Sequence, residues 1–96
     1  MLPIFWTERA LEDLDEIFEY IARRSERAAH DVVDRIEKSV LPAAQFPYMF
    51  RGGKVDGTRE IVAHPNYIVV YRVTLHHIEV SGVVHTSRDY PRTTQR

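Results

Sequence analysis

The side chains of this sequence that could do chemistry are mostly basic and aromatic, and they gather in its second half. Cations neutralise phosphate, aromatic rings stack on bases, and an arginine can stabilise the charge that develops as a phosphodiester is cleaved. The set consists of Arg51, Lys54, Arg59, Tyr67, Tyr71, Arg72, Arg88, Tyr90 and Arg92, with His85 close to Arg88 and Tyr90 in sequence. Such a set can hold RNA, although by itself it identifies no function.

Ordinary structural roles compete with this interpretation. Tyr67 and Tyr71 have the spacing of one strand face, and tyrosines placed in this way are more often core residues. Arg59 and Arg72 could pair with glutamates at 60 or 79 as cross-strand surface charges. The arginines near the end of the chain could be ordinary tail charges.

The charge of the chain is unevenly distributed. Residues 1–50 carry six Lys/Arg and ten Asp/Glu, a net of −4, and residues 51–96 carry seven and four, a net of +3, which together give the overall −1. Solvated outer faces of helices explain the acidic half. The basic half could form a positive face that serves a function.

Composition and spacing argue against several other kinds of site. The chain has no cysteine, so it has no disulfide, thiol nucleophile or cysteine zinc site. Its five histidines lack the HxxxH and HExxH spacings of metal ligands. We therefore predict no metal, no cofactor and no small-molecule ligand.

Two further motifs have plain explanations. The segment Gly52-Gly53-Lys54 lacks the P-loop spacing and is predicted to be a flexible loop. The acids at 12, 13, 15 and 16 are predicted to form the solvated face of an amphipathic helix rather than paired catalytic carboxylates.

No segment approaches the roughly 18–20 apolar residues of a membrane span, and residues 1–6 lack the basic leader of a signal peptide. We expect a cytoplasmic protein that does not bind membranes.

The first half of the chain predicts a short strand and a helix hairpin. Residues 1–6 are apolar and favour a strand. Thr7 can cap a helix over about residues 8–24, and Ser25 can cap a second one. Pro42 is expected to kink or end the second helix.

The second half has the period-two pattern of strands. Strands are predicted over residues 59–63, 67–73 and 77–84 after a loop at 48–57, and Gly82 could mark a bulge. The order β-α-α-β-β-β predicts one α+β domain over residues 1–96, an antiparallel sheet with the helix hairpin packed on one face. The predicted core contains Leu14, Ile17, Ile21, Val33, Ile36, Val69, Tyr71 and Val80.

Four segments together resemble the RelE/ParE family of toxins, in the right order and over nearly the whole chain. They are Trp6 with Ala10-Leu11-Glu12-Asp13-Leu14, Ile17 and Tyr20-Ile21; Gly57-Thr58-Arg59-Glu60; Tyr67-Ile68-Val69-Val70-Tyr71-Arg72-Val73; and Val83-Val84-His85-Thr86-Ser87-Arg88-Asp89-Tyr90-Pro91. The second and fourth segments look closer to the ParE branch. The resemblance implies the toxin half of a type II toxin–antitoxin pair, which a cognate antitoxin neutralises.

The two branches imply different mechanisms. ParE-like toxins inhibit DNA gyrase without cleaving nucleic acid, and this is the function that we expect. One alternative is a RelE-like, ribosome-dependent mRNA endonuclease, and another is a degenerate family member without toxicity. Target-binding candidates are Arg59, Arg72, His85, Arg88, Tyr90 and Arg92, and the catalytic candidates of a nuclease are Arg59, His85, Arg88 and Tyr90. The antitoxin is expected in an apolar groove beside the helix hairpin and the sheet edge.

Overall fold

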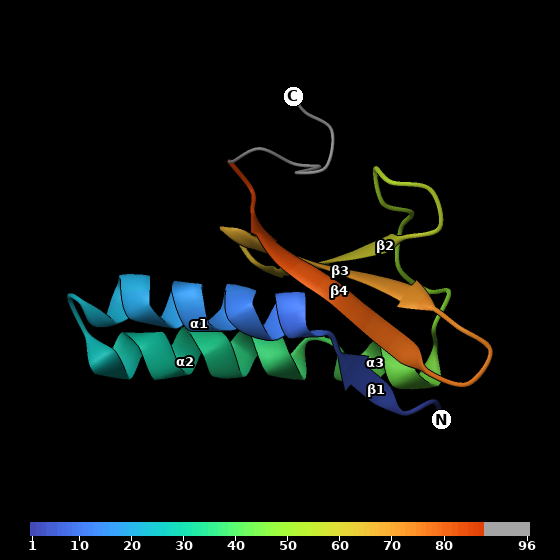
Figure 1. The fold of residues 1–96 in the computed structure, drawn as a ribbon, viewed down its shortest axis with the longest axis horizontal. Coiled ribbons are helices and arrows are strands. Elements are labelled where there is room, and N and C mark those ends of the chain that lie inside the picture. Colours follow the sequence, from blue (N-terminus) through green and yellow to red (C-terminus); the bar gives the residue numbers. More distant parts are fainter. Residues whose placement is uncertain (88–96) are drawn as a thin grey trace.

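A four-stranded sheet covered on one face by a helix hairpin makes up the computed structural model, which describes residues 1–87 (Figure 1). The elements follow one another as β1 (Ile4–Trp6), α1 (Glu8–Ala22), α2 (Glu26–Lys38), α3 (Leu41–Gln45), β2 (Arg59–His64), β3 (Tyr67–Val73) and β4 (Ile78–His85). The predicted α+β class and the helix hairpin on one sheet face are confirmed.

Both long helices begin at the predicted caps. The Oγ1 of Thr7 accepts a hydrogen bond from the Ala10 amide at 3.1 Å, and the Oγ of Ser25 accepts one from Ala28 at 3.1 Å. These bonds satisfy amides that the first helical turn leaves without a partner. Pro42 does not kink α2, which ends at Lys38. It lies instead in the first turn of the short helix α3, where a missing amide donor costs nothing.

The sheet has the order β1-β4-β3-β2 and is mixed. Strands β2, β3 and β4 are antiparallel, but β1 pairs with β4 in parallel, with Ile4 opposite Ile78 and Trp6 opposite Val80. The expectation of a wholly antiparallel sheet is therefore wrong for β1. Parallel neighbours need a long connection, and here most of the chain, from α1 to β3, separates the two strands.

A bulge interrupts β4 next to Gly82, as the glycine suggested. Gly82 pairs with Val70 and Val80 pairs with Tyr71, so Ser81 is the extra residue. Ser81 donates a hydrogen bond from its hydroxyl to the Val70 carbonyl at 3.2 Å. The bulge keeps Val80 and Val83 on the helix-facing side of the sheet.

The core lies between the sheet and the two helices. Six of the eight predicted core residues are buried, and Ile21 and Val33 are partly buried and pack against them. The side chains buried most deeply are those of Tyr71, Ile36, Ile78, Val40, Val69 and Val80. They come from the second helical stripe, β3 and β4, and Ala10, Leu14 and Ile17 of α1 are buried in the same cluster. Burial of both helical stripes against one sheet face therefore holds the fold together.

Candidate functional site

Arg59 begins β2 on the helix-facing side, opposite Tyr71 of β3. Its Nη1 donates hydrogen bonds to the carbonyls of Phe50, at 2.7 Å, and Tyr48, at 3.4 Å. The guanidinium also lies 5.0 Å from the centre of the Tyr48 ring, which is cation–π distance. The arginine therefore holds the chain that leads from α3 to β2.

Tyr71 of β3 also bonds the segment between α3 and β2. The hydroxyl of this fully buried side chain donates a 2.6 Å hydrogen bond to the Pro47 carbonyl. Burial raises the pKa of Tyr71 and the positive charge of Arg59 partly opposes this, so the phenol stays protonated and donates. Tyr71 is thus a core residue, as predicted, and its hydroxyl also holds the backbone of the surface segment at Pro47.

The loop predicted at 48–57 is more ordered than expected. Gly52 forms a bridge with Arg59, the Gly53 amide donates to the Thr58 carbonyl, and the Glu60 amide donates to the Arg51 carbonyl. Arg51 and not Arg59 pairs with the buried carboxylate of Glu60, at 2.9 Å. Gly52 and Gly53 are consequently in one arm of a hairpin that extends β2, and residues 54–57 form its turn.

Arg72 lies on β3 between the buried Tyr71 and the partly buried Val73, and its side chain leaves the sheet on the face opposite the helices. Its Nη1 donates to the Asp56 carbonyl at 3.3 Å. Gly57 has a positive φ of 82°, and a Cβ at this position would approach the same Nη1 to 2.8 Å. Glycine at 57 is therefore needed for the turn, whereas the Arg72 guanidinium is the far end of a flexible side chain and could move aside.

His85 ends β4, as predicted, and lies in a row of rings. The Tyr67 ring lies 5.3 Å from the His85 ring in edge-on geometry and 5.6 Å from the His64 ring. The Nδ1 of His85 accepts from the Ser87 amide at 3.1 Å. The row joins β2, β3 and β4 at one end of the sheet.

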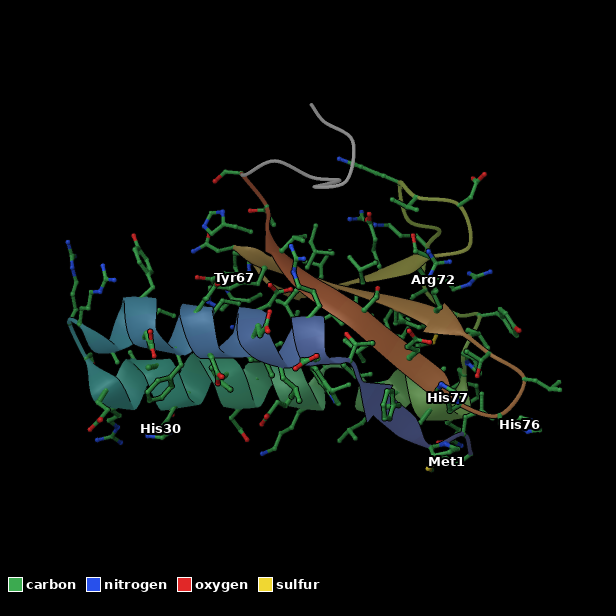
Figure 2. All side chains as sticks on the ribbon, viewed as in Figure 1. Met1, His30, Tyr67, Arg72, His76 and His77 are labelled. Atoms are coloured by element: carbon green, nitrogen blue, oxygen red, sulfur yellow. The ribbon has the colours of Figure 1, made fainter. Side chains whose placement is uncertain are left out.

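The candidate residues within 1–87 do not converge on one point. Arg59 and Arg72 leave the sheet on opposite faces. Arg72 lies opposite Glu79 of β4, six residues before His85 in the same strand. At roughly 3.4 Å per residue, Arg72 and His85 are therefore about 20 Å apart along the strand direction. Figure 2 shows Tyr67 and Arg72 at opposite ends of β3. Arg88, Tyr90 and Arg92 lie outside the described residues.

A groove of about 570 Å³ runs between α1 and the end of β4. Its floor is apolar and aromatic, with Ile17, Tyr67, Val83 and Val84, and Tyr20 lines it while staying 60% exposed. Glu12, Asp13, Glu16 and Glu19 face two arginines, Arg9 and Arg23, which leaves a net charge of −2 with histidine neutral. An acidic groove repels phosphate, so it suits a peptide better than a nucleic acid.

Asp13 is the residue that the sequence analysis placed wrongly. It is 5% exposed and not on the solvated face of α1. Its Oδ2 accepts a hydrogen bond from the Val83 amide at 2.9 Å, and Arg9 lies 3.5 Å from its Oδ1. The helical spacing Ala10-Asp13-Leu14-Ile17, which places Asp13 in the apolar stripe, was the available signal.

Residues 1–87 contain no cluster of three or more His, Cys, Asp or Glu side chains that could hold a metal ion. In the same part of the chain, no helix has the length and apolar character needed to span a membrane.

The chain is similar to known toxins over most of its length. It is 40% identical over 90 residues to the Sinorhizobium fredii protein described as "Putative toxin Y4kP", covering 93% of each chain. It is 33% identical over 89 residues to "Toxin RelE2" of Caulobacter vibrioides, covering 92% of this chain and 99% of the relative.

Solved structures agree on the fold. A chain of the chromosomal ParDE toxin–antitoxin system of P. aeruginosa superposes with a TM-score of 0.77 at 25% identity, over 88% of this chain and 96% of that one. The YoeB dimer of Staphylococcus aureus shares the fold with a TM-score of 0.57 at 18% identity, over 84% and 92% of the two chains. Residues 4–90 match the family model described as the ParE toxin of the type II toxin–antitoxin system parDE. The chain therefore belongs to the ParE family of type II toxin–antitoxin toxins.

Proposed function

We propose that this protein acts by inhibiting DNA gyrase in the cytoplasm, and that it does so by binding rather than by catalysis. Membership of the type II toxins implies a cognate antitoxin as partner. The observation that carries the proposal is the match of residues 4–90 to the ParE family model.

The geometry of the described candidates supports binding over catalysis. A nuclease needs a proton-transfer group and a phosphate-binding cation within reach of one reacting centre. Arg59 donates to backbone carbonyls, and Arg72 and His85 lie on different faces and at different ends of the sheet. Among residues 1–87, no such pair comes together from the predicted set.

We propose that the antitoxin occupies the groove between α1 and β4. β1 pairs only with residues 78–80 of β4, so no described strand lies beside residues 81–85 on that edge. On this edge Thr7 already donates to the Ser81 carbonyl, and Asp13 already accepts from the Val83 amide. The antitoxin segment is therefore expected to lie in the groove and to contact its lining through side chains, rather than to add a strand to the sheet. The acidic rim favours a segment that brings positive charges.

The test of the function uses purified toxin with gyrase and supercoiled DNA, and separately with ribosomes programmed with mRNA. We expect loss of gyrase activity, no mRNA cleavage, and recovery of gyrase activity when the antitoxin is added. Ribosome-dependent cuts with unaffected gyrase would overturn the proposal. They would support the alternative of a RelE-like mRNA endonuclease, which the similarity to "Toxin RelE2" favours.

A further inference from the structure

An exposed apolar surface lies away from the groove, in the segment between α3 and β2. The side chains of Phe46, Tyr48 and Met49 are 55%, 67% and 58% exposed. The Met49 amide donates to the Phe46 carbonyl at 3.1 Å, which closes a turn with Pro47 at its second position. We call residues 46–49 the aromatic turn.

The backbone of the aromatic turn is held by bonds from neighbouring elements. The Phe46 amide donates to the Pro42 carbonyl, the Tyr71 hydroxyl bonds the Pro47 carbonyl, and Arg59 bonds the carbonyls on either side of Met49. The next residue, Phe50, packs edge-on against Tyr71 with ring centroids 6.3 Å apart. The buried Tyr71 and the partly buried Arg59 therefore fix the backbone of a turn in which Phe46, Tyr48 and Met49 are exposed.

A fixed and exposed apolar turn is suited to docking. Large apolar side chains gathered at a surface mark interaction sites, and a preformed backbone avoids the entropy cost of ordering on binding. Aromatic residues held in this way are typical anchors of protein interfaces.

The charge around the aromatic turn is opposite to that of the groove. Residues 46–60 carry Arg51, Lys54 and Arg59 against Asp56 and Glu60, a net of +1, whereas the groove lining has a net of −2. The Arg51 side chain is 60% exposed beside the buried Glu60 that holds it. One partner segment with one sign of charge cannot match both surfaces.

We propose that the aromatic turn contacts the toxin's target, and that it fits an apolar patch bordered by acidic side chains on that protein. This inference rests on the proposed inhibition of gyrase, and it separates the target surface from the antitoxin groove. Cations at the rim steer the encounter, and the ring of Tyr48 and the thioether of Met49 provide the apolar contact.

The test compares the double variant Tyr48→Ala/Met49→Ser with the wild-type toxin in the gyrase assay and in binding to the antitoxin. Both side chains are exposed, so the fold is retained. We expect inhibition of gyrase at least about ten-fold weaker with antitoxin affinity unchanged. The matched control is Leu75→Ser, which removes an 86% exposed apolar side chain from the β3–β4 turn and should leave both readouts unchanged.

The outcomes separate the inference from the function on which it rests. A double variant that inhibits gyrase as well as the wild type overturns the inference and leaves the gyrase function standing. A variant that loses antitoxin binding also overturns it, because the turn would then belong to the other partner. A wild-type toxin that leaves gyrase unaffected overturns both.

Discussion

At the scale of single residues, the row of rings at one end of the sheet includes two histidines whose Nδ1 atoms accept hydrogen bonds from backbone amides. The Nδ1 of His64 accepts from the Asn66 amide at 3.0 Å, and that of His85 accepts from Ser87. Tyr67 lies between the two rings. A proton on the Nδ1 of His64 would remove the acceptor and turn an attraction to the amide into a repulsion.

His64 makes the stability of the fold sensitive to pH. Burial lowers its pKa below the ordinary 6.5, and the charge of Arg35 lowers it further. The unfolded chain therefore binds the proton more tightly than the folded one. The contribution is fully present above about pH 6.5 and is lost as the pH falls through the lower folded pKa.

We expect His64→Asn to reduce the loss of stability on acidification. The Asn Oδ1 can accept from the residue-66 amide in the same way but does not titrate. Urea unfolding at about pH 8 and about pH 5.5 measures the difference. The two proteins should be similar at the higher pH, and an equal loss in both at the lower pH would contradict the prediction.

At the scale of elements, α1 takes the place of a strand along part of β4. β1 ends at Trp6, and the Thr7 amide donates to the Val80 carbonyl at 3.1 Å while its hydroxyl donates to Ser81 at 3.4 Å. Six residues further along the chain, the Asp13 carboxylate accepts from the Val83 amide. Side chains and the end of a helix thus satisfy backbone groups that a longer β1 would otherwise bond.

The contact between α1 and β4 predicts a stability difference between two neighbouring acids. Asp13→Ala leaves the buried Val83 amide without its acceptor and should lower the free energy of unfolding by about 1–3 kcal/mol. Asp15→Ala, on the exposed face of the same helix, is the control and should change it by less than about 0.5 kcal/mol. Chemical denaturation measures both, and equal effects would show that the carboxylate does not join the two elements.

At the scale of the whole molecule, two surfaces of opposite charge serve two proposed partners. The acidic groove lies between α1 and β4, and the basic aromatic turn follows α3, which Figure 1 shows at the other end of the molecule from the α1–α2 turn. Two separate surfaces allow the toxin to engage either partner through its own contacts. On this proposal, the bound antitoxin neutralises the toxin by sterically blocking the target or by changing the conformation of the toxin, and not by covering the residues that contact the target.

The separation of the two surfaces predicts that substitutions of two exposed tyrosines have different effects on antitoxin binding. Tyr20→Ala removes an exposed ring from the groove lining and should weaken antitoxin binding by about 1–2 kcal/mol, about 5- to 30-fold in Kd. Tyr48→Ala removes an equally exposed ring from the aromatic turn and should leave this Kd unchanged. Calorimetric titration measures both, and unchanged binding by Tyr20→Ala would remove the groove as the antitoxin site.

The properties that the sequence determined by itself are local. Helix caps at Thr7 and Ser25, the apolar stripes of both helices and the period-two pattern of β3 depend on residues within a few positions of one another. The same spacing carried the family resemblance, because the motifs combine core positions with turn residues. These features predicted the α+β class, the order of the predicted elements and most of the core.

Only the tertiary structure decided which distant groups meet. The parallel pairing of β1 with β4, the burial of Asp13 against Val83 and the bonds from Arg59 to the 48 and 50 carbonyls all join residues that no short-range pattern relates. An arginine in a strand has the same sequence signature whether it faces a phosphate or a backbone carbonyl. Its role depends on which chain segment packs beside it, and packing of the whole core determines that segment.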